Sequence, residues 1–217
     1  MEQARYVIFD LDDTLVHSPA VRTAFATVAR ELGADRDFMS DLLDAMPGRP
    51  AFEIFEALGL RRSAARAAAG RFLSVLHELN DELPTVAYPD AADTLRALEA
   101  SGSTLMLSTG SSPARAQRVL EQEGWDAFAL VLGSERDCVK GAAHYETITA
   151  EAPTPDWASH AVTIGDSPRD MRLGAEFGVR VRIGIDRDGD ATALVEAGAT
   201  HVVSSLSDVL PILGAAA

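Results

Sequence analysis

One short stretch, residues 6–16, places the strongest constraint on the fold. An apolar run from Tyr6 to Phe9 is followed at once by Asp10, Asp12 and Asp13, and the chain then becomes apolar again. A short continuous apolar run predicts a strand buried on both faces, as in a parallel sheet covered by helices. Carboxylates at the carboxyl end of such a strand lie where open α/β sheets bind ligands. Because buried like charges raise one another's pKa, the stretch predicts a divalent cation with oxygen ligands.

The composition limits the classes of protein that this chain can belong to. With 217 residues and 47% apolar side chains, we expect a globular protein with one large domain, or a domain with a smaller insert. The formal net charge of -14 argues against non-specific binding to nucleic acid or to an anionic membrane. Cys138 is the only cysteine, so an intrachain disulfide is excluded. The sequence has no signal-peptide pattern and no apolar run of about 18 residues, so we expect a cytoplasmic protein.

The apolar pattern divides the chain into two kinds of segment. From about residue 17 to about residue 86, apolar residues recur at helical spacing and no strand pattern is evident. Further along, strands alternate with helices; the strands are expected at 104–108, 128–132, 161–164, 179–183 and 201–203. This alternation predicts an α/β fold with a doubly wound parallel sheet. We expect a core at 1–16 and 88–217, with a helical insert at 17–87.

Polar residues follow three of the expected strands. Each group comes directly after an apolar run: Asp10 and Asp12, then Thr109 and Gly110, then Asp166 and Asp170. Neighbouring strand ends meet at one crevice of a doubly wound sheet, so residues far apart in sequence can meet there.

Each of these residue types has a role in phosphoryl chemistry. The carboxylates Asp10, Asp166 and Asp170 suit Mg²⁺, and a carboxylate beside the metal can also act as a nucleophile. The Thr109 hydroxyl and the Gly110 N–H can hold phosphate oxygens at a helix start. Asp12 could exchange protons with a leaving oxygen and a water molecule.

Lys140 lies in an expected turn and could neutralise the nucleophile and the transferring phosphoryl group. It is the only lysine, and the other basic side chains are arginines. Two explanations for the single lysine remain open: the site requires the chemistry of a lysine, or the composition of the sequence has drifted toward arginine.

The four groups in this order resemble the motifs of the haloacid dehalogenase (HAD) superfamily, and phosphoglycolate-phosphatase-like members in particular. The motifs are Asp10-Leu11-Asp12-Asp13-Thr14-Leu15, Thr109-Gly110, Lys140-Gly141, and Gly165-Asp166-Ser167-Pro168-Arg169-Asp170. The resemblance implies a Rossmann-like core with a helical cap inserted between the first and second motifs. It also implies Asp10 as nucleophile and Asp12 as general acid/base.

The resemblance further implies Mg²⁺ bound by the Asp10 carboxylate, the Asp12 backbone carbonyl and Asp166, with Asp170 nearby. Dehalogenase members lack the second aspartate, so Asp12 favours phosphoryl transfer. Lys140-Gly141 departs from the frequent Lys-Pro form of the third motif. In capped members, the loop that holds Arg49 here faces the site, so Arg49 could pair with a substrate carboxylate or second phosphate. A solvated surface arginine is the alternative.

Together these observations predict a HAD-type phosphoric monoester hydrolase. We expect Mg²⁺ as cofactor, a small soluble phosphorylated substrate, no nucleic-acid or membrane partner, and a monomer or homodimer. Catalytic roles fall to Asp10, Asp12, Thr109 and Lys140, and substrate binding to Thr109, Gly110, Lys140 and Arg49. Two alternatives remain: a sugar phosphomutase or phosphonate-cleaving relative on the same scaffold, and a catalytically silent binding or regulatory homologue.

Overall fold

The protein is described by a computed structural model. The described residues are 6–46, 51–83, 85–135, 138–152, 154–187, 189 and 191–214. Two compact units divide the chain: Met1–His17 together with Val86–Ala217, and Ser18–Thr85. The assignment of residues 17–87 as a cap that covers the site stays a prediction.

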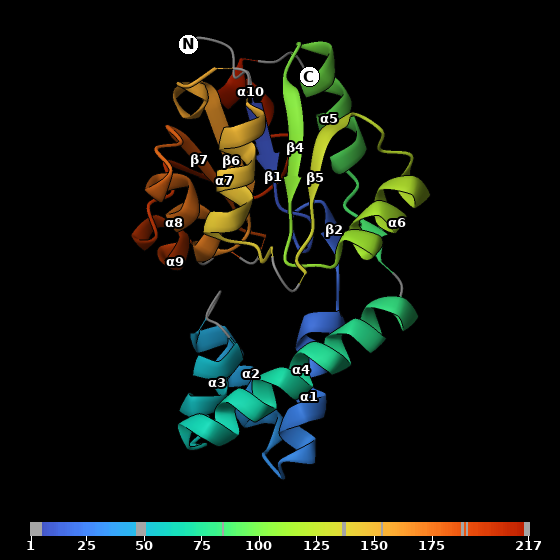
Figure 1. The fold of residues 1–217 in the computed structure, drawn as a ribbon, viewed down its shortest axis with the longest axis vertical. Coiled ribbons are helices and arrows are strands. Elements are labelled where there is room, and N and C mark those ends of the chain that lie inside the picture. The colour runs from blue at the N-terminus through green and yellow to red at the C-terminus, as the bar shows by residue number, and fades with distance from the viewer. Residues whose placement is uncertain are drawn as a thin grey trace. The chain divides into compact units, whose positions relative to one another are not determined.

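A parallel sheet forms the centre of the larger unit (Figure 1). Among the described residues, its strands lie in the order β5-β4-β1-β6-β7-β8. Their bounds are β1 Tyr6–Phe9, β4 Thr104–Ser108, β5 Phe128–Leu132, β6 Ala161–Gly165, β7 Val181–Ile185 and β8 His201–Val203. All neighbouring pairs are parallel, with β1 between β4 and β6. The prediction of an α/β, Rossmann-like doubly wound sheet is confirmed.

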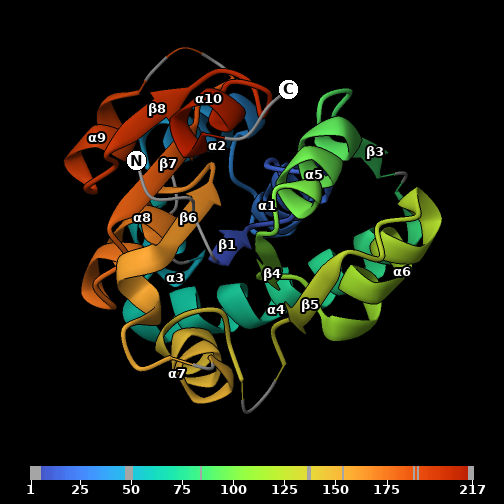
Figure 2. The ribbon, with the colours of Figure 1, turned by 90° about the horizontal axis from the view of Figure 1, so that it is seen from above.

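Helices cover both faces of this sheet, as the view from above shows (Figure 2). Successive residues of a strand point to opposite faces. In β1, Val7 and Phe9 therefore pack in the core with the helices of one face, α5, α6 and α10. Tyr6 and Ile8 pack on the other face with α7 and α8. The helix bounds are α5 Ala91–Ala100, α6 Pro113–Glu123, α7 Ala142–Glu151, η1 Trp157–His160, α8 Pro168–Glu176, α9 Thr192–Glu196 and α10 Val209–Leu213.

The smaller unit is helical. Its helices are α1 Ala20–Glu31, α2 Arg36–Ala45, α3 Ala51–Ala57 and α4 Arg62–Glu82. The apolar stripes predicted from the sequence meet in one core. Within it, the Phe25 ring stacks on Phe72 with centroids 4.1 Å apart and lies 5.6 Å from Phe55. No helix among the described residues combines the length and the apolar character needed to cross a bilayer.

The chain leaves and re-enters the larger unit through two short strands, β2 Val16–His17 and β3 Val86–Ala87, which pair antiparallel and were not predicted from the sequence. One predicted strand boundary was wrong. The strand expected at 179–183 begins at Val181, because the Val179 N–H still bonds to the Gly174 carbonyl at the end of α8.

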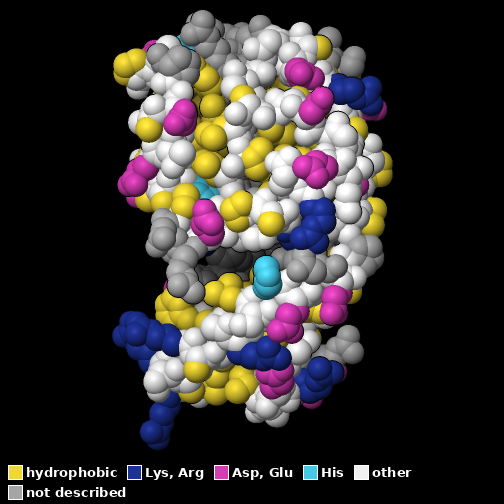
Figure 3. Space-filling view, turned by 45° about the vertical axis from the view of Figure 1, so that its right-hand side comes forward, with side chains coloured by type: hydrophobic (Ala, Val, Ile, Leu, Met, Phe, Trp, Pro, Cys, Tyr) yellow, Lys and Arg dark blue, Asp and Glu magenta, His cyan; other side chains and the backbone are white. Residues whose placement is uncertain are grey.

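Charged side chains are mixed on the surface. On the face shown in Figure 3, Asp and Glu side chains are interspersed with basic side chains.

Candidate active site

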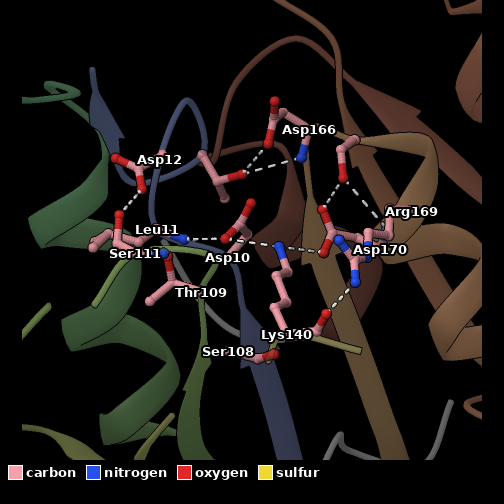
Figure 4. Close-up of polar contacts among 12 residues, drawn as sticks. Asp10, Leu11, Asp12, Ser108, Thr109, Ser111, Lys140, Asp166, Arg169 and Asp170 are labelled. Atoms are coloured by element: carbon pink, nitrogen blue, oxygen red, sulfur yellow. Dashed lines mark hydrogen bonds and ion pairs between the residues drawn. The ribbon is translucent and has the colours of Figure 1, made fainter. Parts of the chain in front are cut away.

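The candidate site lies at the carboxyl edge of the sheet. Asp10 directly follows β1, Thr109 follows β4, and Asp166 follows β6. Backbone bonds continue the strand ladders past the strand ends: Asp10 N–H donates to the Ile164 carbonyl at 2.9 Å, and Thr109 N–H donates to the Leu132 carbonyl at 2.9 Å. The rigid sheet therefore fixes the backbone of these residues, which Figure 4 shows around one centre.

Three carboxylates and one ammonium group meet at this centre. Carboxylate oxygens of Asp10, Asp166 and Asp170 lie within 4.8 Å of one another. The Lys140 Nζ lies 2.9 Å from Asp10 Oδ1 and 2.7 Å from Asp170 Oδ1. Asp10, Lys140 and Asp170 are all buried. The structure thus brings together four of the residues selected from the sequence.

Burial and like charge strongly perturb these groups. Burial raises the pKa of Asp10 to about 7, against the opposing charge of Lys140 and with a further contribution from Asp170. Burial also raises the pKa of Asp166 well above its usual range, and the charges of Asp10 and Asp170 add to that. For Lys140, burial would lower the pKa, but Asp10 and Asp170 outweigh it and raise it. In the described part of the site, Lys140 is therefore the cation that bridges Asp10 and Asp170, with Asp166 beside them.

The donor set suits a hard divalent cation. Such a cation would supply the missing positive charge and allow all three carboxyl groups to ionise. The carboxylates are also held in place: the Thr14 hydroxyl donates to Asp166 Oδ1 at 3.1 Å, and the Ser167 hydroxyl donates to Asp170 Oδ2 at 2.6 Å. These contacts fix ligand orientation before an ion arrives.

Gly165 is required by the close approach of one of these ligands. A Cβ at this position would lie 2.4 Å from Asp170 Oδ2 and 2.8 Å from Asp170 Cβ. Any larger residue would displace the carboxylate. The glycine that precedes Asp166 in the fourth motif therefore makes room for Asp170 at the end of β6.

The loop that presents Lys140 is fixed by two contacts. The Lys140 N–H donates to Ser134 Oγ at 2.8 Å, and an Arg169 Nη2 N–H donates to the Lys140 carbonyl. Gly141, with φ +154°, follows it as the N-cap of α7, which begins at Ala142. Arg169 belongs to the fourth motif, so the third and fourth motifs are joined through the backbone as well as through the Lys140–Asp170 ion pair.

Thr109 and Gly110 form the turn after β4. Thr109 is fully buried, and its Oγ1 accepts a hydrogen bond from the Ser111 N–H at 3.1 Å. Its carbonyl accepts from the Ser134 hydroxyl at 3.0 Å, which links this turn to the Lys140 loop. Gly110 is exposed, so its backbone is accessible at the start of α6.

Asp12 has its own set of partners. Its Oδ2 accepts from the Ser111 hydroxyl at 2.6 Å and from Arg115 Nη1 at 3.1 Å, and its Oδ1 lies 2.7 Å from Arg115 Nη2. In Figure 4 its carboxylate points toward Ser111 and away from Lys140. Sequence reasoning missed both Ser111 and Arg115. The sequence did contain one indication of the Arg115 contact: Arg115 falls in the first turn of the expected helix, where the helix macrodipole disfavours a cation that has no anionic partner.

Two further residues from the sequence complete the picture. Arg49 lies outside the described residues. Asp13 adopts a positive φ of 55° in the turn after β1, and its Oδ1 lies 3.3 Å from His17 Nδ1 in a partly exposed pair.

Comparisons with known proteins agree with this geometry. A family model for haloacid dehalogenase-like hydrolases matches residues 4–178. A phosphoglycolate phosphatase from Rhodospirillum rubrum is 32% identical over 193 residues, covering 81% of this chain and 77% of the relative. These matches confirm the predicted resemblance and the prediction of a hydrolase.

Solved structures show the same fold. A haloacid dehalogenase-like family protein from Streptococcus pneumoniae, SP0104, superposes with a TM-score of 0.77 at 23% identity, covering 98% of this chain and 99% of that one. A HAD-hydrolase of Bacillus subtilis, YfnB, described in a magnesium-bound form, gives a TM-score of 0.68 at 16% identity, covering 98% and 99%. The chain belongs to the haloacid dehalogenase-like hydrolase family.

Proposed function

We propose that this hydrolase is a Mg²⁺-dependent phosphatase that cleaves a small soluble phosphate monoester through an aspartyl-phosphate on Asp10. The observation that carries the proposal is the buried cluster in which Lys140 Nζ bridges Asp10 and Asp170, beside Asp166. A nucleophilic carboxylate facing a fixed ammonium group and a hard-cation donor set suits attack on an anionic phosphoryl group.

The ion would be held by the carboxylates of Asp10, Asp166 and Asp170 and by the Asp12 carbonyl. When bound, Mg²⁺ would neutralise phosphoryl oxygens and help to orient them. Lys140 supplies a second, permanent positive charge to the nucleophile and the transferring group. The Thr109 side chain and the Gly110 N–H hold phosphoryl oxygens on the other side.

The chemistry then proceeds in two displacements. An Asp10 carboxylate oxygen attacks phosphorus, the bond to the leaving oxygen breaks, and Asp12 gives its proton to that oxygen. In the second step, Asp12 takes a proton from water as the water oxygen attacks the phosphorus of the aspartyl-phosphate. Inorganic phosphate leaves and Asp10 is regenerated.

The relatives suggest where to look for the substrate. Because the Rhodospirillum rubrum relative is named a phosphoglycolate phosphatase, a phosphate monoester that also carries a carboxylate is the first candidate class. Arg49 is the residue proposed to pair with that second anion, in a helical cap at residues 17–87. Hydrolysis of such a compound fits a cytoplasmic enzyme that acts as a monomer or homodimer.

The direct test is Asp10→Asn. We expect kcat for an aryl phosphate at saturating Mg²⁺ to fall by more than about 10³-fold, since the amide is a poor nucleophile. The matched control is Asp13→Asn, at the residue directly after Asp12 in the same turn. Asparagine tolerates the positive φ of this position, so activity should be retained. Near wild-type turnover by Asp10→Asn would refute the mechanism.

Product analysis separates the alternatives, because a phosphomutase or a phosphonate-cleaving enzyme would not release inorganic phosphate from a monoester as its main reaction.

A further inference from the structure

We propose that Arg115 is a positioning residue for Asp12: it binds the Asp12 carboxylate through two nitrogens and stabilises the charge left there when the leaving oxygen is protonated. The inference rests on the proposed role of Asp12 as general acid/base. In this proposal Arg115 does not contact the substrate, and its effect on the reaction is exerted through the Asp12 carboxylate that it binds.

Two guanidinium nitrogens of Arg115 and the Ser111 hydroxyl surround the Asp12 carboxylate. Arg115 Nη2 lies 2.7 Å from Asp12 Oδ1, and Arg115 Nη1 donates to Oδ2 at 3.1 Å. The same Nη1 donates to Ser111 Oγ at 2.7 Å, and the Ser111 hydroxyl donates to Asp12 Oδ2 at 2.6 Å. Asp12 Oδ2 therefore accepts two hydrogen bonds while Oδ1 lies within ion-pair distance of the same guanidinium, and together these contacts hold the position of the carboxylate.

Arg115 occupies a place that is unfavourable for an isolated cation. It is the third residue of α6, in the turn where the helix macrodipole repels positive charge, and only 2% of its surface is exposed. A buried guanidinium needs a well-aligned anionic partner. Asp12, which is part-buried beside it, is that partner.

Arg115 also separates the roles of two neighbouring aspartates. Asp10 pairs with Lys140 and belongs to the acidic cluster, whereas Asp12 pairs with Arg115. In the described part of the chain, the cluster suited to a cation contains Asp10, Asp166 and Asp170. Arg115 thus keeps the Asp12 side chain outside the set of metal ligands, where it can exchange protons.

The pairing of Arg115 with Asp12 has a role in the proton transfer. As the phosphorus–oxygen bond breaks, its electron pair goes to the leaving oxygen, which takes the proton from the Asp12 carboxyl group. The negative charge that appears on Asp12 is then shared with the Arg115 guanidinium and the Ser111 hydroxyl. The same carboxylate is thereby oriented to take a proton from water in the second step.

The dependence of the rate on the leaving group tests the proposal. We would measure kcat/KM over a series of monoesters from 4-nitrophenyl phosphate to alkyl phosphates. The value of kcat/KM depends only on the steps up to departure of the alcohol, so the later hydrolysis of the aspartyl-phosphate does not affect it. For Arg115→Met, kcat/KM should fall by about 10²-fold for alkyl phosphates, whose leaving oxygen must be protonated, and by less than about fivefold for 4-nitrophenyl phosphate.

The control is Arg118→Met, an exposed arginine on the same helix, which should leave the whole series unchanged. A parallel loss for every ester in Arg115→Met would show a purely structural role and overturn the inference. If Arg115→Met does not fold, Arg115→Lys keeps the charge but loses the two-nitrogen contact, and it should give the same selective loss at smaller size. An unselective loss in that variant also overturns the inference.

Asp12→Asn separates failure of the inference from failure of the proposed function. If Asp12→Asn itself shows no selective loss for alkyl phosphates, the general-acid role of Asp12 is wrong. If Asp12→Asn is selective and the Arg115 variants are not, only the inference fails. In the double variant, adding Arg115→Met to Asp12→Asn should change kcat/KM for alkyl phosphates by less than about threefold, because the partner is already gone.

Discussion

Gly133 is the position at which a single methyl group should be most damaging to the site's framework. It follows β5, and a Cβ built on it would lie 2.4 Å from Pro113 N, 2.6 Å from Pro113 Cα and 2.8 Å from the Ser112 carbonyl carbon. All three are backbone atoms, so no side-chain rotation can relieve the overlap. Ser112 is the N-cap of α6, so Gly133→Ala pushes on the start of that helix.

The size of the effect follows from this geometry. Overpacking in a well-packed region typically costs about 1–3 kcal/mol, and contact with fixed backbone puts this substitution at the upper end, about 3 kcal/mol. Gly133 is not among the glycines with positive φ, so the cost is steric and has no added conformational part. For a chain of this length, about 2–4 °C of Tm is lost per kcal/mol, which gives a fall of roughly 6–12 °C.

Thermal unfolding followed by circular dichroism measures this change. The matched control is Gly110→Ala, in the turn before α6: its φ is not positive and nothing lies within 4 Å of the added Cβ. The control should stay within about 0.5 kcal/mol of wild type in stability. A Tm for Gly133→Ala within about 2 °C of wild type would refute the reasoning, because it would mean that the start of α6 moves freely relative to β5.

Two other predictions concern the charged centre. Lys140→Met should lower kcat by about 10²–10³-fold in steady-state assays at saturating Mg²⁺, because it removes a preorganised charge; a loss below about tenfold would contradict that role. Mg²⁺ at about 100 times its Kd should stabilise the protein by about 2.7 kcal/mol and raise Tm, and Asp166→Asn should largely abolish the rise. A proton competes with the metal at Asp10, whose pKa is about 7, so the increase in Tm caused by Mg²⁺ should be larger at about pH 8 than at about pH 6. An equal increase in Tm at both pH values would exclude Asp10 as a ligand.

The parts of the fold that the sequence predicted are those with a local cause. The apolar run of β1 is buried on both faces, so nearly every position is apolar and the carboxylates after it mark the strand end. β4 and β6 are buried in the same way, and each is followed by a polar residue, Thr109 after β4 and Asp166 after β6. Because parallel strand ends must lie at one edge, this local pattern was enough to predict that Asp10 and Asp166 meet at one site, whereas Lys140, which lies in a turn, was assigned from its chemistry and from the family resemblance.

The missing parts depend on contacts between distant segments. Arg115 and Asp12 are 103 positions apart, and their pairing depends on where α6 starts relative to β1. The pairing of β2 with β3 involves two residues on each strand, too few to leave a periodic pattern in the sequence. The late start of β7 has a similar origin, since the turn that ends α8 includes Val179.

The single lysine gives this protein an unusual response to lysine-directed reagents. Lys140 carries the only side-chain amine of the sequence, and the folded chain buries it between two carboxylates. Acylating reagents and a lysine-specific protease therefore have one side-chain target, and they can reach it only when the site opens. The rate of cleavage after Lys140 would then report unfolding of the segment that carries this residue, without any introduced label.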